Sequence, residues 1–350
     1  MSRSDLGEAF RRLIRNTGPL SVSRYMGESN AHYYAAGDPL GVGGDFVTAP
    51  EISQMFGEMI GLWCADLWHR AGRPDRVRYV ELGPGRGTLA KDVLRAMKQQ
   101  GLEPDAHFVE GSPALRGIQS GAVPGAAHHD DLTNVPDGGP LFILANEFFD
   151  ALPIRQVVRT ARGWRERMVG LNDDGAFVFI AGDQPLDEAL APEKREADEG
   201  TIIETCPAAS ALMQEISARL KAQGGAALII DYGAFESWAG STLQAVRAHR
   251  KVDPLKAPGS ADLTAHVDFA ALAEATERAG VEQVFRSTQG AFLERLGITA
   301  RANALAKAQP YRREQVAKEH RRLCAPDEMG DLFKVMALVS GGWPIPTGFD

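Results

Sequence analysis

The chain has 350 residues, 44% of them hydrophobic, which is enough for one large domain or for a domain that carries an insertion. No apolar stretch approaches the roughly 18 residues of a membrane-spanning helix, so we expect no membrane insertion, no signal peptide and a bacterial cytoplasmic location. The formal net charge of −8 gives little attraction to phosphate backbones, which argues against nucleic acid as a partner and suits a basic peptide or an arginine side chain better.

Residues 1–75 are predicted to be mainly helical. Leu6, Phe10 and Ile14 lie at helical spacing, and the acidic Asp5 and Glu8 argue against a transit peptide, because such peptides are poor in acids. We therefore predict that the chain begins with an amphipathic helix of the fold.

A second helix is predicted to start at Thr48, where the sequence TAPE combines a capping box with a proline in the first turn. The apolar side chains that follow repeat on one face, and such a stripe indicates core packing rather than cofactor contact: Ile52, Met55, Phe56, Met59, Ile60, Trp63 and Leu67. The N-terminus of this helix could also bind an anion.

The run YVELGPGRGT predicts a strand that ends in Glu81, a glycine-rich turn and the start of a helix. Glycine has no Cβ and tolerates positive φ, so such a turn lets the backbone approach a ligand closely. The dinucleotide fingerprint G-x-G-x-x-G would need a glycine in place of Thr88, which disfavours a nicotinamide dehydrogenase. The observed spacing of Gly83, Gly85 and Gly87 is typical of S-adenosylmethionine-dependent methyltransferases. The alternative interpretation is a strand-to-helix turn that binds no ligand.

The run HFVE predicts a second short strand that ends in Glu110. This carboxylate lies about twenty residues beyond the glycine turn, where doubly wound folds place the acid that binds a ribose diol. The alternative is a solvated charge at a strand end. Asp130 and Asp131 follow a loop rich in glycine and proline, near the expected end of a third strand, and one of them could accept from an adenine amino group.

No metal site or disulfide is expected. The adjacent His128 and His129 cannot share one face of a helix or strand and have no third ligand at a clear spacing, so they are interpreted as solvated loop residues. The three cysteines are scattered and form no C-x-x-C pair, which indicates reduced thiols.

The apolar run that starts at Leu141 predicts a buried parallel strand, because such a strand is covered on both faces. It stops abruptly at Asn146, Glu147 and Asp150. Ligands bind outside the carboxyl ends of the strands in open parallel sheets, so these side chains are predicted to line an active site. A polar loop that caps the next helix is the alternative, which is weaker for Glu147 because glutamate is not a usual cap.

Residues 155–205 interrupt the alternation of strands and helices. Three short antiparallel strands and an exposed connection predict a β-rich insertion, of a kind that commonly carries partner recognition. The alternation resumes with a helix over 208–222 and a fifth strand that ends at Asp231. The stretch 234–265, which carries proline and glycine, is predicted to be a long loop over the cleft. A helix over 267–279, a strand near 281–286, a charged helix over 300–323 and a last strand over 332–339 are predicted to follow.

Seven runs, spread from about Gly18 to the last strand, match one known family: GDFVTAPEISQMFGE, VELGPGRGTL, HFVE, NEFFDALP, GGAALIIDYG, APGSADLTAHVDF and FLERLGI. The first and fourth are far more specific than the glycine motif, which many methyltransferases share. On these runs the chain resembles the MidA-type methyltransferase family, which includes the mitochondrial complex I assembly-factor methyltransferase. That relative needs an import sequence, whereas this chain begins almost directly at family sequence.

The resemblance implies a class I S-adenosylmethionine fold, an α/β Rossmann-like fold with a mainly parallel seven-stranded sheet over residues 76–350. It also implies methylation of an arginine in a protein partner, a quinone-site subunit of respiratory complex I or its bacterial counterpart, in support of its assembly. Carried over to this sequence, the cofactor would be bound by Glu81, Gly83, Gly85, Gly87, Glu110, Asp130 or Asp131, and the helix that begins at Thr48. Asn146, Glu147 and Asp150 would face the substrate.

Methyl transfer from a sulfonium is an in-line displacement, so the enzyme must align donor and acceptor and exclude water. An arginine acceptor is charged at neutral pH, and a pair of carboxylates can hold its guanidinium. Glu147 with Asp150 is the predicted pair, and Asp231 could accept a proton or orient the substrate.

Two further hypotheses belong to other classes. The first is a methyltransferase that acts on a small molecule or on a different residue, which nothing in the sequence excludes. The second is a non-catalytic assembly factor that kept the fold, and the intact Glu81, glycine turn and Glu110 argue against it.

Overall fold

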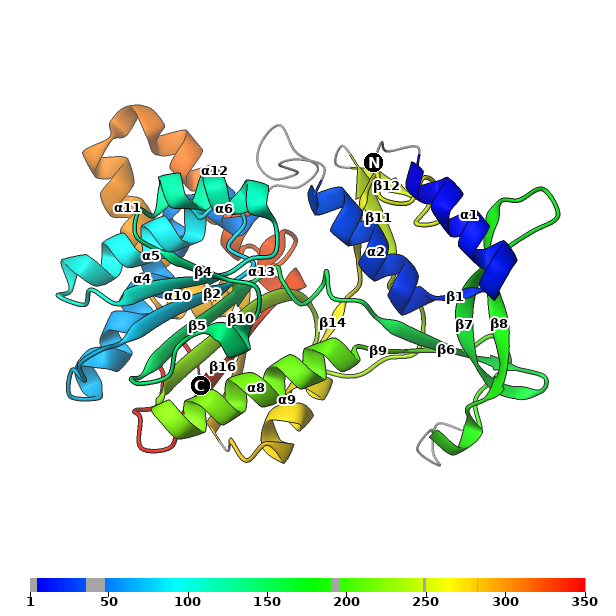
Figure 1. Ribbon diagram of the computed structural model, residues 1–350. Coiled ribbons are helices and arrows are strands. Elements are labelled where there is room, and N and C mark those ends of the chain that lie inside the picture. Colours follow the sequence, from blue (N-terminus) through cyan, green and yellow to red (C-terminus); the bar gives the residue numbers. More distant parts are fainter. Residues whose placement is uncertain (1–4, 36–47, 190–195, 248–249, 282, 350) are drawn as a thin grey trace. The chain divides into compact units, whose positions relative to one another are not determined.

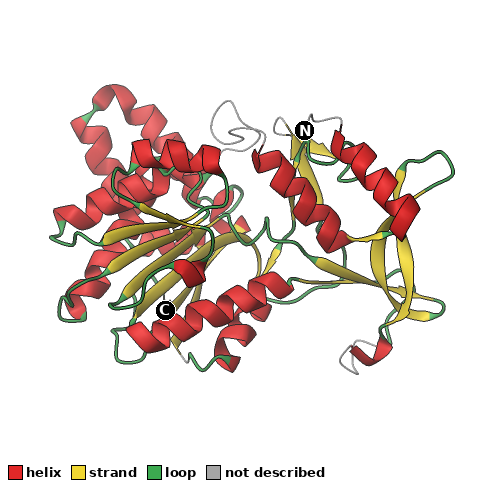
Figure 2. Ribbon diagram, viewed as in Figure 1, coloured by secondary structure: helices red, strands yellow, loops and turns green. Residues whose placement is uncertain are grey.

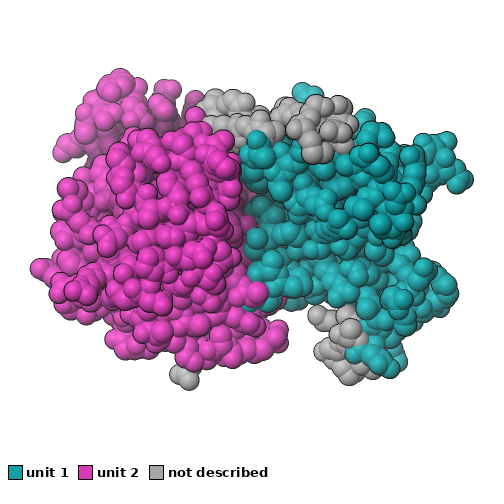
Figure 3. Space-filling model, in the orientation of Figure 1, with its two compact units in different colours: residues 1–39, 150–210, 236–266 teal, residues 40–149, 211–235, 267–350 magenta. Residues whose placement is uncertain are grey.

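The computed structural model describes residues 5–35, 48–189, 196–247, 250–281 and 283–349 (Figure 1). The chain divides into two compact units, coloured in Figure 3. Unit 1 comprises residues 1–39, 150–210 and 236–266, and unit 2 comprises 40–149, 211–235 and 267–350. Unit 1 therefore joins the first helices to the segment predicted as an insertion and to a third segment that the sequence did not connect with them.

Unit 2 is built on an eight-stranded sheet in the order β15-β16-β10-β5-β2-β3-β4, with β14 beside β10. The strands β4, β3, β2, β5 and β10 run parallel, whereas β16 is antiparallel to both β10 and β15. This arrangement confirms the predicted mainly parallel α/β fold. The strands are β2 Arg78–Leu82, β3 Asp105–Val109, β4 Ala127–His129, β5 Leu141–Asn146, β10 Gly225–Ala234, β14 Val267–Asp268, β15 Gln283–Thr288 and β16 Phe333–Val339.

Helices cover both faces of this sheet (Figures 1 and 2). They are α3 Ala49–Ile52, α4 Gln54–Arg70, α5 Thr88–Gln99, α6 Pro113–Ala122, α8 Pro207–Gln223, α9 Phe269–Arg278, α10 Gln289–Arg295, α11 Ile298–Ala308, α12 Arg313–Cys324 and α13 Met329–Leu332, with short 3₁₀ turns η1 Leu132–Asn134 and η3 Pro310–Arg312. The boundary between the two units falls within α8. Among the described residues, no helix combines the length and the apolar character that crossing a membrane requires.

The core of unit 2 explains the apolar runs of its strands. Phe142 and Leu144 of β5 join the apolar cluster that contains Phe56 and Trp63 of α4, whereas the intervening Ile143 is equally buried but lies outside that cluster. A strand covered on both faces must be apolar at every position. The apolar stripe of α4 is core, as predicted.

The helix predicted to start at Thr48 is interrupted, which corrects that prediction. α3 ends at Ile52, and Ser53 adopts an extended conformation with φ −158°. The Ser53 hydroxyl then accepts the N–H of Met55 and caps α4, because serine offers the backbone a local hydrogen bond that competes with helix continuation. The part of the GDFVTAPE run before Thr48 lies outside the described residues.

Unit 1 contains an antiparallel sheet in the order β1-β7-β6-β9, with β8 beside β7. Its elements are α1 Asp5–Thr17, β1 Leu20–Ser21, α2 Val22–Ala35, β6 Arg155–Thr160, β7 Gly163–Leu171, β8 Phe177–Pro185, η2 Asp187–Ala189 and β9 Ile202–Thr205. This confirms the predicted antiparallel β insertion. Leu6, Phe10 and Ile14 of α1 are buried in the core of this unit, as their helical spacing predicted.

The prediction of a long loop over 234–265 is wrong. This stretch forms an antiparallel three-stranded sheet in unit 1, with β11 Gln244–Arg247 between β12 Arg250–Val252 and β13 Asp262–Thr264. Ala245 and Leu263 are paired across the sheet and buried in the core of unit 1. Strands of three or four residues show too little alternation to be distinguished from a loop by sequence pattern.

Candidate functional site

The glycine turn between β2 and α5 has a backbone that other residues would adopt only with strain. Gly83, Gly85 and Gly87 have φ angles of +59°, +54° and +80°. A Cβ added to Gly83 would lie 2.6 Å from Cδ2 of Phe148, so the Phe148 ring occupies the space that a side chain at this position would need. The Gly83 N–H donates to the Val109 carbonyl at 3.0 Å and holds the turn against the end of β3.

Glu81 is a buried carboxyl at the carboxyl end of β2, with only 3% of its surface exposed. Burial raises its pKa to about 7, although a hydrogen bond donated by the Tyr79 hydroxyl favours the charged form. A carboxyl with this pKa changes charge near neutrality, so it is suited to bind a cationic group that enters the site.

Glu110 follows β3 and is held by α6. Its Oε1 accepts the Ser112 N–H at 2.8 Å, and its Oε2 accepts the Gln119 side-chain amide at 3.1 Å. The same Gln119 Nε2 donates to the Gly85 carbonyl at 2.8 Å. One fully buried glutamine therefore connects the predicted ribose-binding acid to the glycine turn. Burial raises the pKa of Glu110.

Sequence reasoning missed Gln119. A glutamine within a helix is usually a solvent-exposed residue, and no motif marks this one. Its Oε1 is buried without a hydrogen-bond partner in the described part of the chain. A ligand that donates a hydrogen bond there would remove the cost of that unpaired acceptor.

Asp130 and Asp131 lie just beyond β4 and are exposed. Asp130 accepts a hydrogen bond from Arg116 at 2.5 Å. Asp131 caps η1 by accepting the Thr133 N–H at 2.8 Å, which lowers its pKa. Neither residue has a buried carboxylate, and their predicted contact with an adenine edge stays a prediction.

The interpretation of His128 and His129 as solvated loop residues is wrong, because both lie on β4 and are half-buried. The His129 ring is inclined at 30° to that of His107 on β3, with 2.9 Å between His129 Nε2 and His107 Nδ1. Burial lowers the pKa of all three of these histidines.

Glu147 stands at the carboxyl end of β5 and has φ +50°, which is uncommon for a residue other than glycine. Both hydrogen bonds that the described residues make to its carboxylate go to Oε1, from the Ala49 N–H at 3.0 Å and the Asn146 amide at 3.3 Å. Burial raises the pKa of Glu147 to about 7. The Asn146 Oδ1 is buried without a partner in the described chain. Strain at such a position is typical of functional sites.

Asp231 positions the turn that carries Glu147. It is fully buried on β10, and its Oδ2 accepts the N–H groups of Phe148 at 3.1 Å and Phe149 at 2.9 Å. Its Oδ1 accepts the N–H of Tyr232 at 2.9 Å. These bonds explain how an acidic side chain is tolerated inside the sheet.

Asp150 belongs to unit 1, whereas Glu147 belongs to unit 2. Burial is the main cause of the raised pKa of Tyr34 in unit 1, and the negative charges of Asp262 and Asp150 raise that pKa further. The Asp150 carbonyl accepts the N–H of Ala265 at 2.9 Å. The predicted pair of Glu147 and Asp150 stays a prediction.

A pocket of about 560 Å³ opens beside the start of α5, within the size range of small-molecule sites. Its walls include Glu51, Arg86 and Thr88, and the Thr88 hydroxyl donates to Glu51 at 2.5 Å. Thr48 caps α3 without a side-chain hydrogen bond, and α3 has only four residues.

The residues that the structure brings together fit S-adenosylmethionine. The glycine turn carries no side chain at three alternate positions, and Glu110 supplies a carboxylate for hydroxyl donors. The unpaired oxygens of Gln119 and Asn146 are further acceptors. A ligand with amino and hydroxyl donors would satisfy these acceptors.

Residues 59–286 match a family model described as "Putative S-adenosyl-L-methionine-dependent methyltransferase". The chain is similar to the mitochondrial protein arginine methyltransferase NDUFAF7 of Danio rerio, with 36% identity over 93% of this chain and 84% of the relative. The human protein of the same name is 35% identical over 93% of this chain and 81% of its own length.

The chain is also similar to a solved structure from Burkholderia thailandensis, described as a COG1565 superfamily member and likely methyl transferase, that contains bound S-adenosyl-homocysteine. It has a TM-score of 0.84 and 31% identity to this chain, and the match covers 99% of this chain and 94% of the other. The family model spans more than half of the chain, and the named relatives match nearly its whole length at more than 30% identity. The chain therefore belongs to the MidA-type family of S-adenosylmethionine-dependent methyltransferases.

Proposed function

We propose that this methyltransferase modifies an arginine of a protein partner, a quinone-site subunit of respiratory complex I or its bacterial counterpart, and so supports assembly of that complex. The observation that carries the proposal is Glu147, a half-buried carboxyl at positive φ with a pKa raised to about 7 at the carboxyl end of a central strand. The printed name of the relatives, protein arginine methyltransferase, supports the same acceptor.

In this proposal Glu81 and the three glycines line the methionine and ribose of the cofactor, Glu110 binds the ribose, and Asp130 or Asp131 contacts the adenine. The helix end at Thr48 lies on the methionine side. Bound S-adenosylmethionine supplies an electrophilic methyl group on its sulfonium. The protein contributes alignment, exclusion of water and a base.

Glu147 serves as the site for the guanidinium. Because Oε1 already accepts two hydrogen bonds, Oε2 is the oxygen that receives an arginine N–H. The attacking nitrogen gains a methyl group and loses a proton, so the product is a methylated guanidinium of unchanged charge. A carboxyl with a pKa near 7 can hold that proton at neutral pH, and the neighbouring Asn146 completes the substrate side of the site within unit 2.

A labelling experiment tests the acceptor. The purified protein is incubated with extract and methyl-labelled S-adenosylmethionine, and the labelled protein is hydrolysed to amino acids. We expect label in methylarginine of one protein band. Label confined to small molecules, or to an amino acid other than arginine, would support the methyltransferase hypothesis with a different acceptor and would contradict this one.

The cofactor assignment is tested by calorimetric titration with S-adenosylhomocysteine. Glu110→Ala is expected to weaken micromolar binding by about 1 kcal/mol or more, because it removes a charge-assisted hydrogen bond. Glu103→Ala, which removes an exposed carboxylate paired with Lys98, is the matched control and should bind like the unmodified protein. Absence of binding to the folded, unmodified protein would favour the non-catalytic assembly factor, or a site completed by the partner.

A further inference from the structure

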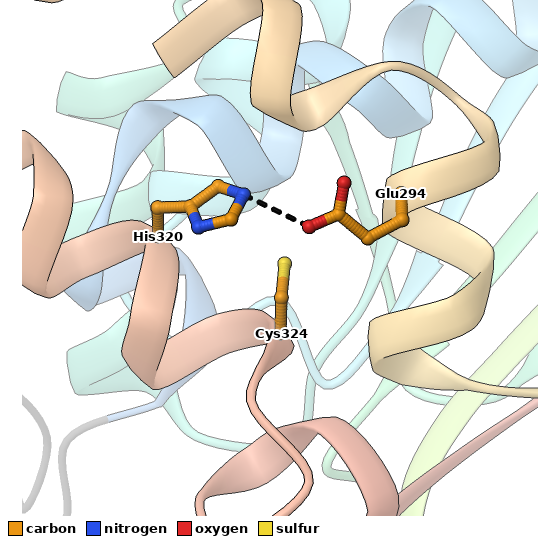
Figure 4. A group of neighbouring side chains, drawn as sticks. All are labelled: Glu294, His320 and Cys324. Carbon is orange, nitrogen blue, oxygen red and sulfur yellow. Dashed lines mark ion pairs between the residues drawn. The ribbon is translucent and has the colours of Figure 1, made fainter. Parts of the chain in front are cut away.

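Three side chains of metal-binding type, none of them among the residues assigned to the cofactor or the substrate, converge in unit 2 on α10 and α12. Glu294 lies on α10, and His320 and Cys324 lie one turn apart on α12. Figure 4 shows all three pointing toward one another. One ligand atom from each lies within 4.8 Å of the other two. An i, i+4 pair shares a helix face, so α12 presents its imidazole and thiol together.

The spacing of these atoms is close to that of a tetrahedral zinc site. His320 Nε2 lies 3.0 Å from Glu294 Oε1. Zinc bonds of about 2.0–2.3 Å place neighbouring ligand atoms roughly 3.2–3.7 Å apart in a tetrahedron. Shifts of roughly 1 Å by side chains at the protein surface would therefore complete the coordination.

The type of ligand selects the metal. A thiolate with an imidazole and a carboxylate favours zinc over magnesium or calcium, which take oxygen ligands. Cys324 is a free cysteine. Zinc binds the thiolate, so binding transfers the thiol proton to solvent.

The surroundings of the cluster meet two further requirements of a metal site. The Thr299 hydroxyl donates to Glu294 Oε2 at 2.6 Å and lies 2.9 Å from His320 Nε2, so it orients both side chains, as second-layer partners of metal ligands do. The side chains of Glu294 and His320 are 42% and 24% exposed, which gives an ion access from solvent and leaves room for a water ligand.

We propose that Glu294, His320 and Cys324 bind a zinc ion, with water as the fourth ligand, and that the ion fixes α10 to α12. The sequence predicted no metal site, because His320 and Cys324 form a single pair and the third ligand, Glu294, lies on another helix 26 residues earlier in the chain. The competing explanation is an ion pair between Glu294 and His320 beside an unrelated thiol.

The test uses the full-length protein, treated with a chelator and then titrated with Zn²⁺ or Co²⁺. We expect one equivalent of metal to bind, a thiolate-to-metal charge-transfer band with Co²⁺, and a rise in melting temperature with Zn²⁺. Cys324→Ser should abolish the band and weaken binding at least about 100-fold, and Glu294→Gln, which keeps an acceptor for Thr299, should weaken it about 10-fold.

Cys206→Ser is the matched control, because Cys206 is another free cysteine and lies in unit 1, outside the cluster. It should bind metal like the unmodified protein. Melting curves of all variants without metal separate lost coordination from lost folding. Failure of the unmodified protein to bind one equivalent, or equal binding by Cys324→Ser and Cys206→Ser, would overturn the proposal.

Discussion

Gly83→Ala is expected to weaken S-adenosylhomocysteine binding by about 5- to 150-fold in a protein that still folds. The new methyl group would lie 2.6 Å from Cδ2 of Phe148, inside any real contact distance between carbon atoms. Either the ring or the glycine turn must move, and overpacking of this kind costs about 1–3 kcal/mol. A moved turn no longer offers its backbone to the ligand. Calorimetric titration measures the affinity, and thermal unfolding measures the stability.

Gly101→Ala separates the effect of this contact from general backbone strain. Gly101 follows the C-cap residue of α5 and has φ +82°, and no heavy atom of the described chain lies within 4 Å of the position that its Cβ would take. Alanine at such a φ costs roughly 1–2 kcal/mol at either position. We expect both variants to lose stability and only Gly83→Ala to lose affinity. Equal affinities in the two variants would show that the glycine turn does not contact the ligand.

The glycine turn could be predicted from sequence because its signal is local. A strand, three glycines at alternate positions and an amphipathic helix all lie within twenty-one residues of Tyr79, and the apolar run before Asn146 marks a strand covered on both faces. The carboxyl ends of such strands meet at one edge of a sheet. Residue type and the spacing of apolar residues along the sequence were therefore enough to place Glu81 and Glu147 at the carboxyl ends of strands.

The supporting contacts could not be predicted, because they depend on non-local packing. Gln119 connects Glu110 to the Gly85 carbonyl, and Asp231 holds the backbone of Phe148 from a neighbouring strand. Nothing in the local pattern around either residue encodes those partners. The assignment of residues 236–266 to unit 1 likewise depends on packing against distant sequence, because Asn30 of α2 hydrogen-bonds the backbone of Leu263 on β13.

Glu147→Gln is expected to reduce methyl transfer by roughly 10²–10⁴-fold, the range for loss of a general base. The amide keeps an oxygen for the Ala49 N–H but cannot take a proton from the guanidinium. Activity of the unmodified protein should rise with pH as Glu147 ionises around pH 7, and this rise should be absent in the variant. Affinity for S-adenosylhomocysteine should stay within about twofold of the unmodified value, because Glu147 faces the acceptor in this proposal.

The same substitution has an opposite effect on stability. The folded-state pKa of Glu147 is about 7 and lies above the ordinary glutamate value of 4.5, so the folded protein binds the extra proton between these values. Its free energy of unfolding then falls as the pH rises through this window, by up to about 3 kcal/mol for this group. Glu147→Gln should therefore be more stable than the unmodified protein at pH 8 and similar to it at pH 4.

Glu103→Gln is the control for both measurements, since it neutralises a carboxylate on the surface. It should change neither the activity nor the pH dependence of unfolding. A Glu147→Gln variant that keeps its activity and its pH profile would move the role of base to Asp150 or Asp231. A variant that loses affinity for S-adenosylhomocysteine as much as it loses activity would place Glu147 in the cofactor site. S-adenosylhomocysteine binds without the arginine acceptor, so a residue that contacts only the acceptor should not affect its affinity.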